Sequence, residues 1–153
     1  MLPTRLIIMR HAKSSWVDSN LNDHDRPLNP RGRKDAPRIY QALMEMDWLP
    51  DTVFLSSSKR TSETLSLMNM DRNEVKIEIK PSIYHASLEE LIIQLENIEN
   101  NETTMILGHN PGSEMLINNL TGDFIRMPTA SAALLIESNG SWEVEGVIRP
   151  KEI

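Results

Sequence analysis

The amino-acid sequence predicts an α/β fold: one three-layer α/β/α domain with a mostly parallel central sheet and at least one antiparallel strand. Short apolar runs alternate with longer amphipathic segments along the 153 residues, which is the pattern of strand–helix–strand units. The last two apolar runs are joined by Asn139-Gly140, a favoured hairpin turn, so one of those two strands should run antiparallel. We expect one domain over residues 1–153.

Six segments are expected to form strands because they are short, apolar and bounded by turn residues. Leu6 to Met9 is continuously apolar, as in a strand buried on both faces. Val75 to Ile79 alternates apolar and charged residues, as in a strand with one polar face. The expected strands are Arg5–Met9, Thr52–Ser57, Val75–Ile79, Thr103–Leu107, Ala132–Glu137 and Trp142–Ile148.

Four helices are expected between these strands. The first should start at Asn29-Pro30, an N-cap followed by Pro at the first helical position, and run to about Met46, with Pro37 kinking or restarting it. The second starts near Ser58. The third covers Ser87–Ile98 and opens on a sequence close to a capping box.

The fourth helix is expected after Asn110-Pro111, again an N-cap followed by Pro, and should run to about Leu120. The polar, turn-rich stretch from Trp16 to Asn29 reads as a long loop. Long loops in compact domains are often functional.

Composition and charge exclude several classes of function. The net charge of −6 disfavours a nucleic-acid partner, and the absence of Cys excludes disulfides, thiolate catalysis and Cys-based zinc sites. The longest apolar stretch near the N-terminus, Leu6 to Met9, is too short for a signal peptide or a membrane helix. We therefore expect a cytoplasmic protein with no membrane partner, and a monomer is the expected oligomeric state.

Chemistry-bearing residues follow three of the expected strands. Arg10-His11 follows the first, Arg60 follows the second and His109 follows the fourth. The carboxyl ends of parallel strands share one edge of a sheet, where α/β folds bind their ligands. Arg offers planar, bidentate donors to phosphate oxygens, and helix N-termini attract anions. The arrangement predicts a phosphoryl site without a metal.

His11 is the stronger candidate for a nucleophile because a strand-end residue beside Arg10 is rigidly aimed. The attacking ring nitrogen must carry no proton, and neighbouring Arg charges disfavour the imidazolium. The other ring nitrogen then needs an acceptor, and we expect a backbone carbonyl to fill that role.

Several motifs, which follow one another along nearly the whole chain, strengthen the prediction of a phosphoryl site. They are Arg10-His11-Ala12, Asp25-Arg26-Pro27-Leu28, Arg31-Gly32, the run from Ser56 to Thr64, Tyr84-His85-Ala86-Ser87 and Gly108-His109-Asn110-Pro111-Gly112. With these motifs the chain resembles the histidine phosphatase superfamily, of phosphoglycerate-mutase-like fold, and within it the small SixA-type phosphohistidine phosphatases.

The resemblance implies a covalent phosphohistidine intermediate on His11, with the phosphoryl group bound by Arg10, Arg60 and His109. Asn110, expected first as an N-cap, is a further candidate phosphate ligand. The resemblance implies no metal and no organic cofactor. The implied substrate is a His-phosphorylated protein of signal transduction, either a phosphotransfer domain or a phosphocarrier.

Departures from the superfamily pattern narrow the substrate. Mutases and sugar phosphatases of the superfamily that this chain resembles usually have the sequence Arg-His-Gly-Glu-Ser near the nucleophile, followed by an Asn. In this chain Ala12 and Lys13 replace the Gly and the Glu, and Val17 stands where the Asn would be. Larger members carry an acidic proton donor in the segment Ile83-Tyr84-His85, which holds no Asp or Glu here. An alcohol leaving group needs a proton, while a protonated phosphoimidazole leaves as neutral imidazole. The departures therefore favour N–P hydrolysis.

Other groups could still act as the acid or contact the substrate. His85 either touches the site or packs behind it. The carboxylates that could substitute are Asp18, Asp23, Asp25 and Glu114.

Three alternative functions stay open. One is a phosphatase for small phosphate esters, and another is a non-enzymatic phospho-binding module, against which the presence of both His11 and His109 argues. The third is a metal site on these two histidines, against which the charges of Arg10 and Arg60 argue because they would repel a cation.

Overall fold

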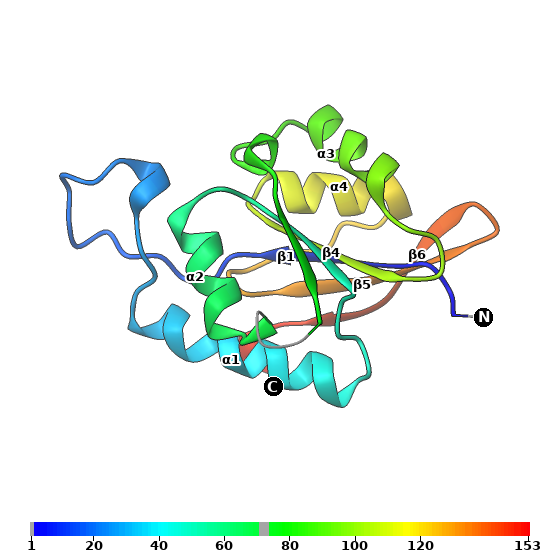
Figure 1. The fold of residues 1–153 in the computed structure, drawn as a ribbon, viewed down its shortest axis with the longest axis horizontal. Coiled ribbons are helices and arrows are strands. Elements are labelled where there is room, and N and C mark those ends of the chain that lie inside the picture. The colour runs from blue at the N-terminus through cyan, green and yellow to red at the C-terminus, as the bar shows by residue number, and fades with distance from the viewer. Residues whose placement is uncertain (1, 71–73) are drawn as a thin grey trace.

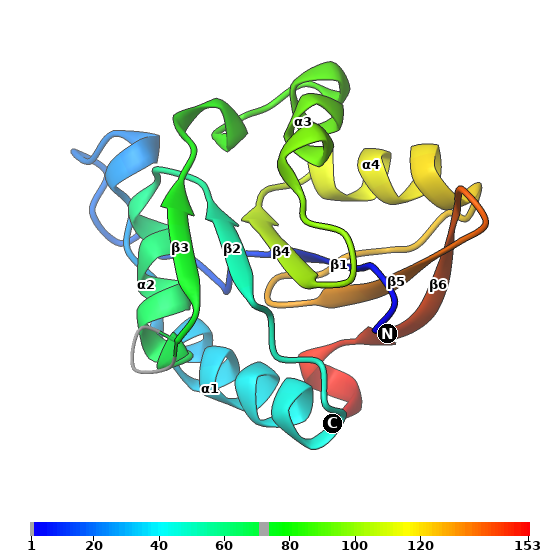
Figure 2. The same ribbon diagram turned by 45° about the vertical axis from the view of Figure 1, so that its right-hand side comes forward.

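The computed structural model describes residues 2–70 and 74–153 and shows a six-stranded mixed sheet between two layers of helices (Figure 1). The strands are β1 (Arg5–Arg10), β2 (Thr52–Leu55), β3 (Lys76–Ile79), β4 (Thr103–Gly108), β5 (Ala132–Ser138) and β6 (Ser141–Ile148). Their order is β3-β2-β4-β1-β5-β6 (Figure 2). The first four strands pair in parallel, and β5 runs antiparallel to β1 and to β6. The predicted fold class is confirmed.

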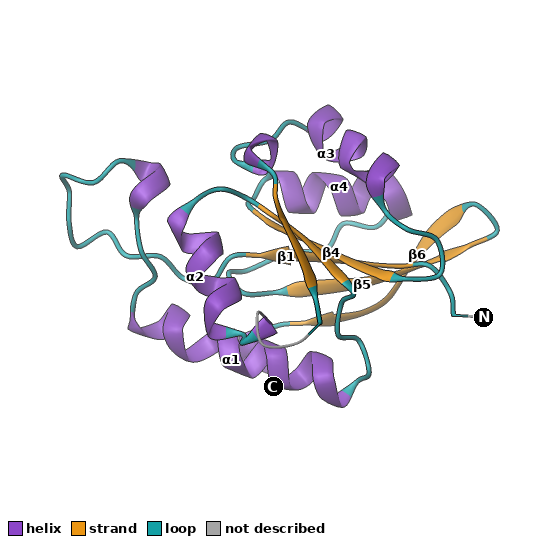
Figure 3. Ribbon diagram, in the orientation of Figure 1, coloured by secondary structure: helices purple, strands orange, loops and turns teal. Residues whose placement is uncertain are grey.

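Two helices cover each face of the sheet. Helices α1 (Pro30–Glu45) and α2 (Lys59–Leu67) lie below it in Figure 3, and α3 (Leu88–Gln94) and α4 (Gly112–Thr121) lie above it. Among the described helices, none combines the length and apolar character required to span a bilayer. Short 3₁₀ helices occur at Asp23–Asp25, Pro81–Ile83, Leu95–Asn97 and Pro150–Glu152.

The core has two halves because alternate residues of each central strand point to opposite faces. Ile7 and Met9 of β1 pack with α1 and α2, whereas Leu6 and Ile8 pack with α3 and α4. All four side chains are buried, which is why β1 is continuously apolar. The strand that positions Arg10 and His11 is thus held on both faces.

The strand register aligns the strand ends that carry the candidate site. Arg10 of β1 lies opposite Gly108 of β4, and Leu55 of β2 lies opposite Leu107. Because β5 is antiparallel to β1, its first residue, Ala132, lies at the same edge. The segment before it, residues 122–131, therefore also reaches this edge.

Three local predictions differ notably from the structure. Helix α1 continues through Pro37 without restarting, because Ala36, Ile39 and Leu43 around it are anchored in the core. Helix α3 has the predicted capping box, formed by Ser87 and Glu90, but it ends at Gln94 and passes into a 3₁₀ turn.

The third difference concerns the start of α4. This helix begins at Gly112 rather than at Pro111, and the Asn110-Pro111 peptide is cis. Asn110 is therefore not the N-cap. Its carboxamide oxygen still accepts from the backbone N–H of Glu114 (3.3 Å). Its carboxamide nitrogen donates to the carbonyl of Met127 (2.9 Å) and to Oε2 of Glu114 (3.1 Å), so Asn110 ties the start of α4 to segment 122–131.

Candidate active site

Three of the four residues expected from the strand ends form one buried cluster. The ring centroids of His11 and His109 are 5.3 Å apart, and the side chain of Arg60 contacts both rings. Its Nε lies 3.4 Å from Nε2 of His11, and its Nη2 lies 3.4 Å from Nδ1 of His109. All three residues are less than a tenth exposed. Because Arg is always a donor, each of these two ring nitrogens is an acceptor.

The protonation of His11 is fixed by a backbone contact. Its Nδ1 lies 2.7 Å from the carbonyl oxygen of Ala12, which can only accept, so Nδ1 carries the proton. Nε2 is left with a free lone pair facing Arg60. Burial, opposed by that backbone hydrogen bond and aided by the charges of Arg60 and Arg10, lowers the pKa of His11 to about 3. The carbonyl acceptor expected from the sequence is present.

Backbone contacts hold His11 from three sides. Its N–H donates to the carbonyl of Gly108 in β4, and its carbonyl accepts from Ala130. The next N–H, of Ala12, donates to Oγ1 of Thr64 in α2 (3.0 Å), and both of these residues are fully buried. The nucleophile candidate is therefore preorganised by β4, α2 and segment 122–131 together.

His109 is oriented by Ser56, which lies at the end of β2. The Nε2 of His109 is 2.8 Å from Oγ of Ser56, a fully buried side chain. Burial lowers the pKa of His109 to about 3, with His11 and Arg60 contributing. Ser58, near which the second helix was expected to start, is the N-cap of α2, but no pattern in the sequence pointed to the role of Ser56.

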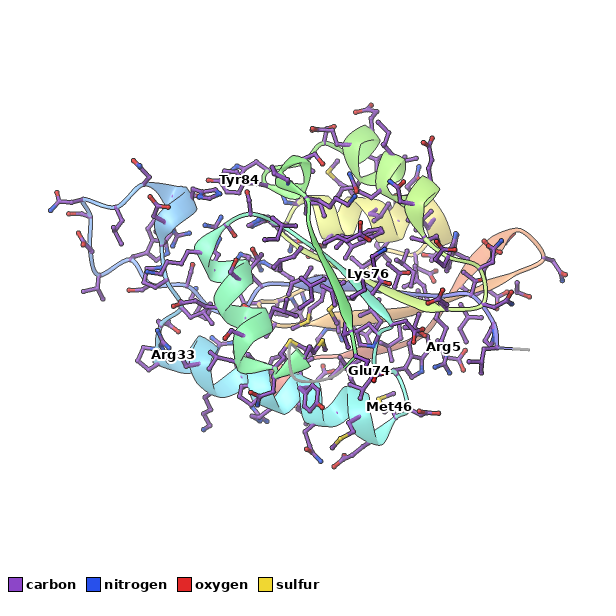
Figure 4. All side chains as sticks on the ribbon, viewed as in Figure 1. Arg5, Arg33, Met46, Glu74, Lys76 and Tyr84 are labelled. Atoms are coloured by element: carbon purple, nitrogen blue, oxygen red, sulfur yellow. The ribbon has the colours of Figure 1, made fainter. Side chains whose placement is uncertain are left out.

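Asp23 was one of several carboxylates named from the sequence, and it is the one that reaches Arg60. Its Oδ2 accepts from Nη2 of Arg60 (3.0 Å), from the hydroxyl of Tyr84 (2.6 Å) and from Nε2 of His85 (3.0 Å). Its backbone carbonyl accepts from Nη1 of Arg60 (2.7 Å). Tyr84 lies beside the loop that carries Asp23 (Figure 4). The long loop therefore closes over the exposed side of Arg60.

These contacts keep the Asp23 carboxyl group ionised. Partial burial opposes ionisation, but hydrogen bonds from Tyr84, His85 and Arg60 outweigh it and hold the pKa of Asp23 well below its usual range. A carboxylate in this state accepts protons poorly and donates none.

Arg10 and Glu114 are linked through segment 122–131. Nη1 of Arg10 donates to the carbonyl of Met127 (3.2 Å), and the N–H of Met127 donates to Oε2 of Glu114 (2.7 Å). Nε of Arg10 is buried with no hydrogen-bond partner among the described residues. Arg10 therefore retains a donor for a ligand, while Glu114 is engaged in holding the backbone.

Two of the candidate acids are not brought to this cluster. Asp18 is exposed and accepts from the N–H of Asn20 within its own turn, and the exposed Asp25 contacts His24. His24 itself bonds to Oγ of Ser57 (3.0 Å). Nothing in the composition of the loop distinguishes Asp23 from its neighbours; only the folded path does.

The described residues contain no group of three or more His, Asp or Glu side chains arranged to hold a metal ion. A cavity of about 170 Å³ lies beside His109, with His85 and Asn110 at its polar wall and Ile83 and Leu91 at its apolar wall. The cluster and the neighbouring Arg10 thus present a lone pair, two guanidinium groups and a second imidazole beside a small cavity, which suits the transfer of a phosphoryl group.

Comparison with known proteins supports this assignment. Residues 6–115 match the model of the histidine phosphatase superfamily (branch 1). An uncharacterised chloroplastic protein of Arabidopsis thaliana is 36% identical over 95% of this chain and 78% of its own length. A 2,3-bisphosphoglycerate-dependent phosphoglycerate mutase of Streptomyces avermitilis is 37% identical, over 49% of this chain and 31% of its own.

Two solved structures share the fold along nearly their whole length. The SixA protein of Agrobacterium tumefaciens superposes with a TM-score of 0.87 at 24% identity, covering 97% of this chain and 99% of that one. A protein histidine phosphatase SixA complexed with tungstate superposes with a TM-score of 0.83 at 18% identity, covering 97% and 98%. Together with the site geometry, these matches show that the chain belongs to the histidine phosphatase superfamily, whose members are phosphatases or mutases, and that its fold is that of the SixA structures.

Proposed function

We propose that the protein is a phosphohistidine phosphatase that hydrolyses the N–P bond of a His-phosphorylated protein through a phosphohistidine intermediate on His11. The observation that carries the proposal is the state of His11: Nδ1 is locked onto the Ala12 carbonyl, and the unprotonated Nε2 lies among Arg10, Arg60 and His109. A neutral imidazole with a fixed lone pair is ready for nucleophilic attack.

In the first step, the Nε2 lone pair of His11 attacks phosphorus while the bond from phosphorus to the substrate imidazole breaks. The bonding electrons return to the substrate ring, which leaves as neutral imidazole if its other nitrogen is already protonated. Arg10 and Arg60 hold the phosphoryl oxygens through their N–H groups. His109 joins them once the bound dianion favours a proton on its Nδ1, the nitrogen that accepts from Arg60 in the free protein. Water then attacks the phosphorus, phosphate departs, and Nε2 regains its lone pair.

The carboxylates near the cluster favour an N–P substrate over an ester. Asp23 is held ionised by its three donors, and Glu114 accepts from Asn110 and Met127. Neither is a ready proton donor for an alcohol leaving group, which ester hydrolysis requires. His85, through its hydrogen bond to Asp23, is the group near the cluster that could supply a proton, so ester hydrolysis is the second candidate.

The partner and the compartment belong to the same proposal. The expected partner is a phosphotransfer domain or a phosphocarrier protein, and the expected compartment is the cytoplasm.

The test compares substrates under metal-free conditions. Purified protein with a chelator should release phosphate from a phosphohistidine peptide, and His11→Ala should abolish this release, by at least about 10³-fold. Comparable turnover of sugar phosphates would favour the ester phosphatase instead. Near-normal turnover by His11→Ala would show that the nucleophile is misassigned.

A further inference from the structure

A second, strongly basic groove adjoins the phosphoryl site and shares Arg10 with it. This basic groove has a volume of about 410 Å³. Its walls come from four separate parts of the chain that meet at the carboxyl edge of β1 and around the start of α1. Its cationic residues are Arg10, Lys13, Arg31, Arg126, Arg149 and Lys151, and its acidic residue is Glu152.

Only two of these six cations, Arg31 and Arg149, form an ion pair among the described residues. Lys13, Arg126 and Lys151 form no ion pair with any described residue, whereas Arg149 lies 3.5 Å from Glu152 and Arg31 lies 3.4 Å from its partner in α1, Asp35. The chain as a whole carries a net charge of −6. Such a concentration of positive charge in an acidic protein is unfavourable by itself, and an anionic ligand would relieve it.

The surface beside the groove favours a protein as the source of the anions. Phe124 is 90% exposed and precedes Arg126 by two residues on segment 122–131. Aromatic residues and Arg are both enriched at protein interfaces, and a small polyanion would leave Phe124 unused.

We propose that the basic groove binds acidic side chains that flank the phosphohistidine of the substrate protein. This inference rests on the proposed function, because Arg10 lies at both the groove and the phosphoryl site. At about 3.3 Å per extended residue, a Glu or Asp two to four positions from the phosphohistidine lies about 7–13 Å from it. Such a residue can enter the groove while the phosphoryl group contacts Arg10. The groove thus selects substrates by their flanking charge.

The experiment uses two synthetic phosphohistidine peptides, one with flanking glutamates and one with flanking lysines, and phosphoramidate as a small N–P substrate. The glutamate peptide should have a KM about tenfold lower than the lysine peptide, and about 0.5 M salt should remove most of this difference. Arg126→Glu and Lys151→Glu should each raise the KM of the glutamate peptide about tenfold while leaving kcat within about twofold.

Lys76→Glu is the matched control because it makes the same change of charge on β3 (Figure 4), away from the carboxyl edge. It should leave the KM of both peptides unchanged. Equal KM values for the two peptides, or an equal effect of Lys76→Glu and Lys151→Glu, would overturn the proposal. So would competition by inorganic tripolyphosphate without any effect of peptide charge, since this would identify a small polyanion as the ligand.

A binding measurement separates this proposal from the proposed function. Fluorescence anisotropy of the labelled glutamate peptide, without phosphate, on the His11→Ala protein reports the groove alone. If Lys151→Glu weakens this binding but no N–P substrate is turned over, the result supports acidic-peptide binding by the groove and contradicts the proposed function. If phosphohistidine is turned over but the binding does not depend on charge, the groove proposal fails.

Discussion

The position of one proton determines what His11 can do. The Ala12 carbonyl holds that proton on Nδ1, and Arg60 approaches the lone pair on Nε2. His109 has the complementary arrangement, with Nδ1 facing Arg60 and Nε2–H directed at Ser56. The two rings thus use opposite nitrogens toward the same guanidinium, and each is oriented by a different acceptor.

Ser56→Ala tests the second of these acceptors. The change should leave Nε2–H of His109 buried without a partner, at a cost of about 1–3 kcal/mol in the free energy of unfolding. Because His109 loses its orientation, kcat for phosphohistidine should fall about 10- to 100-fold. Ser56→Thr, which retains the hydroxyl group, is the control. Steady-state kinetics and chemical denaturation measure both effects. An unchanged kcat would show that Ser56 does not orient His109 for the reaction.

The residues of the site differ in how far they can be predicted from the sequence. Arg10, His11, Arg60 and His109 were predictable because each follows a strand whose apolar pattern is plain. The contact of Asp23 with Arg60 joins residues 37 positions apart, and it depends on the path of a polar loop that has no periodicity to read.

At the scale of elements, the close approach of α1 to the end of β1 positions the residues after His11. Gly32, in the first turn of α1, packs against the backbone of Lys13, and an added Cβ would lie 2.2 Å from the Lys13 carbonyl oxygen. Backbone atoms cannot yield as a flexible side chain does. The helix therefore depends on Gly at this position for steric reasons.

Gly32→Ala should consequently push α1 away from the strand end. We expect a loss of about 2–4 kcal/mol in the free energy of unfolding, typical of a backbone clash in a packed region, together with lower kcat because the Ala12 carbonyl shifts. Gly146→Ala is the control, since an added Cβ there makes an ordinary contact 3.8 Å from the Leu134 side chain. Equal stability of the two variants in urea denaturation would contradict this packing argument.

Helix and strand identities were all predicted, but several boundaries were not. Strands β1 and β4 were predictable because each contains a short continuous apolar run, Leu6–Met9 in β1 and Met105–Leu107 in β4. The start of α4 was predicted at Asn110-Pro111 from the usual cap pattern, and the Asn110 carboxamide oxygen does accept from the backbone N–H of Glu114 in the first turn (3.3 Å). The helix nevertheless begins at Gly112, and the carboxamide nitrogen bonds to Met127 and Glu114, partners that no local sequence pattern reveals.

At the scale of the whole molecule, keeping two imidazoles neutral in the interior makes stability depend on pH. His11 and His109 have pKa values of about 3 in the folded protein, against about 6.5 in an unfolded chain. Below pH 6.5 the unfolded state binds protons that the folded state does not, so folding is progressively disfavoured as pH falls from 6.5 toward 3.

As the pH falls from 7 to 5, each ring should lower the free energy of unfolding by about 2 kcal/mol. Urea denaturation at several pH values measures this slope. The double variant His11→Asn, His109→Asn should show a much shallower dependence over the same range. A wild-type stability that is flat between pH 7 and pH 5 would mean that the two rings are not held neutral.

The phosphorylated form of His11 is the most direct test of the central claim. Rapid quenching in base of protein mixed with ³²P-labelled phosphohistidine peptide, followed by acid and base stability tests and peptide mapping, identifies the labelled residue. The account predicts an acid-labile, base-stable label on the peptide that contains His11, absent from His11→Ala and still formed by His109→Asn at a reduced rate. Turnover of the peptide without such a label, or a label on another residue, would contradict it.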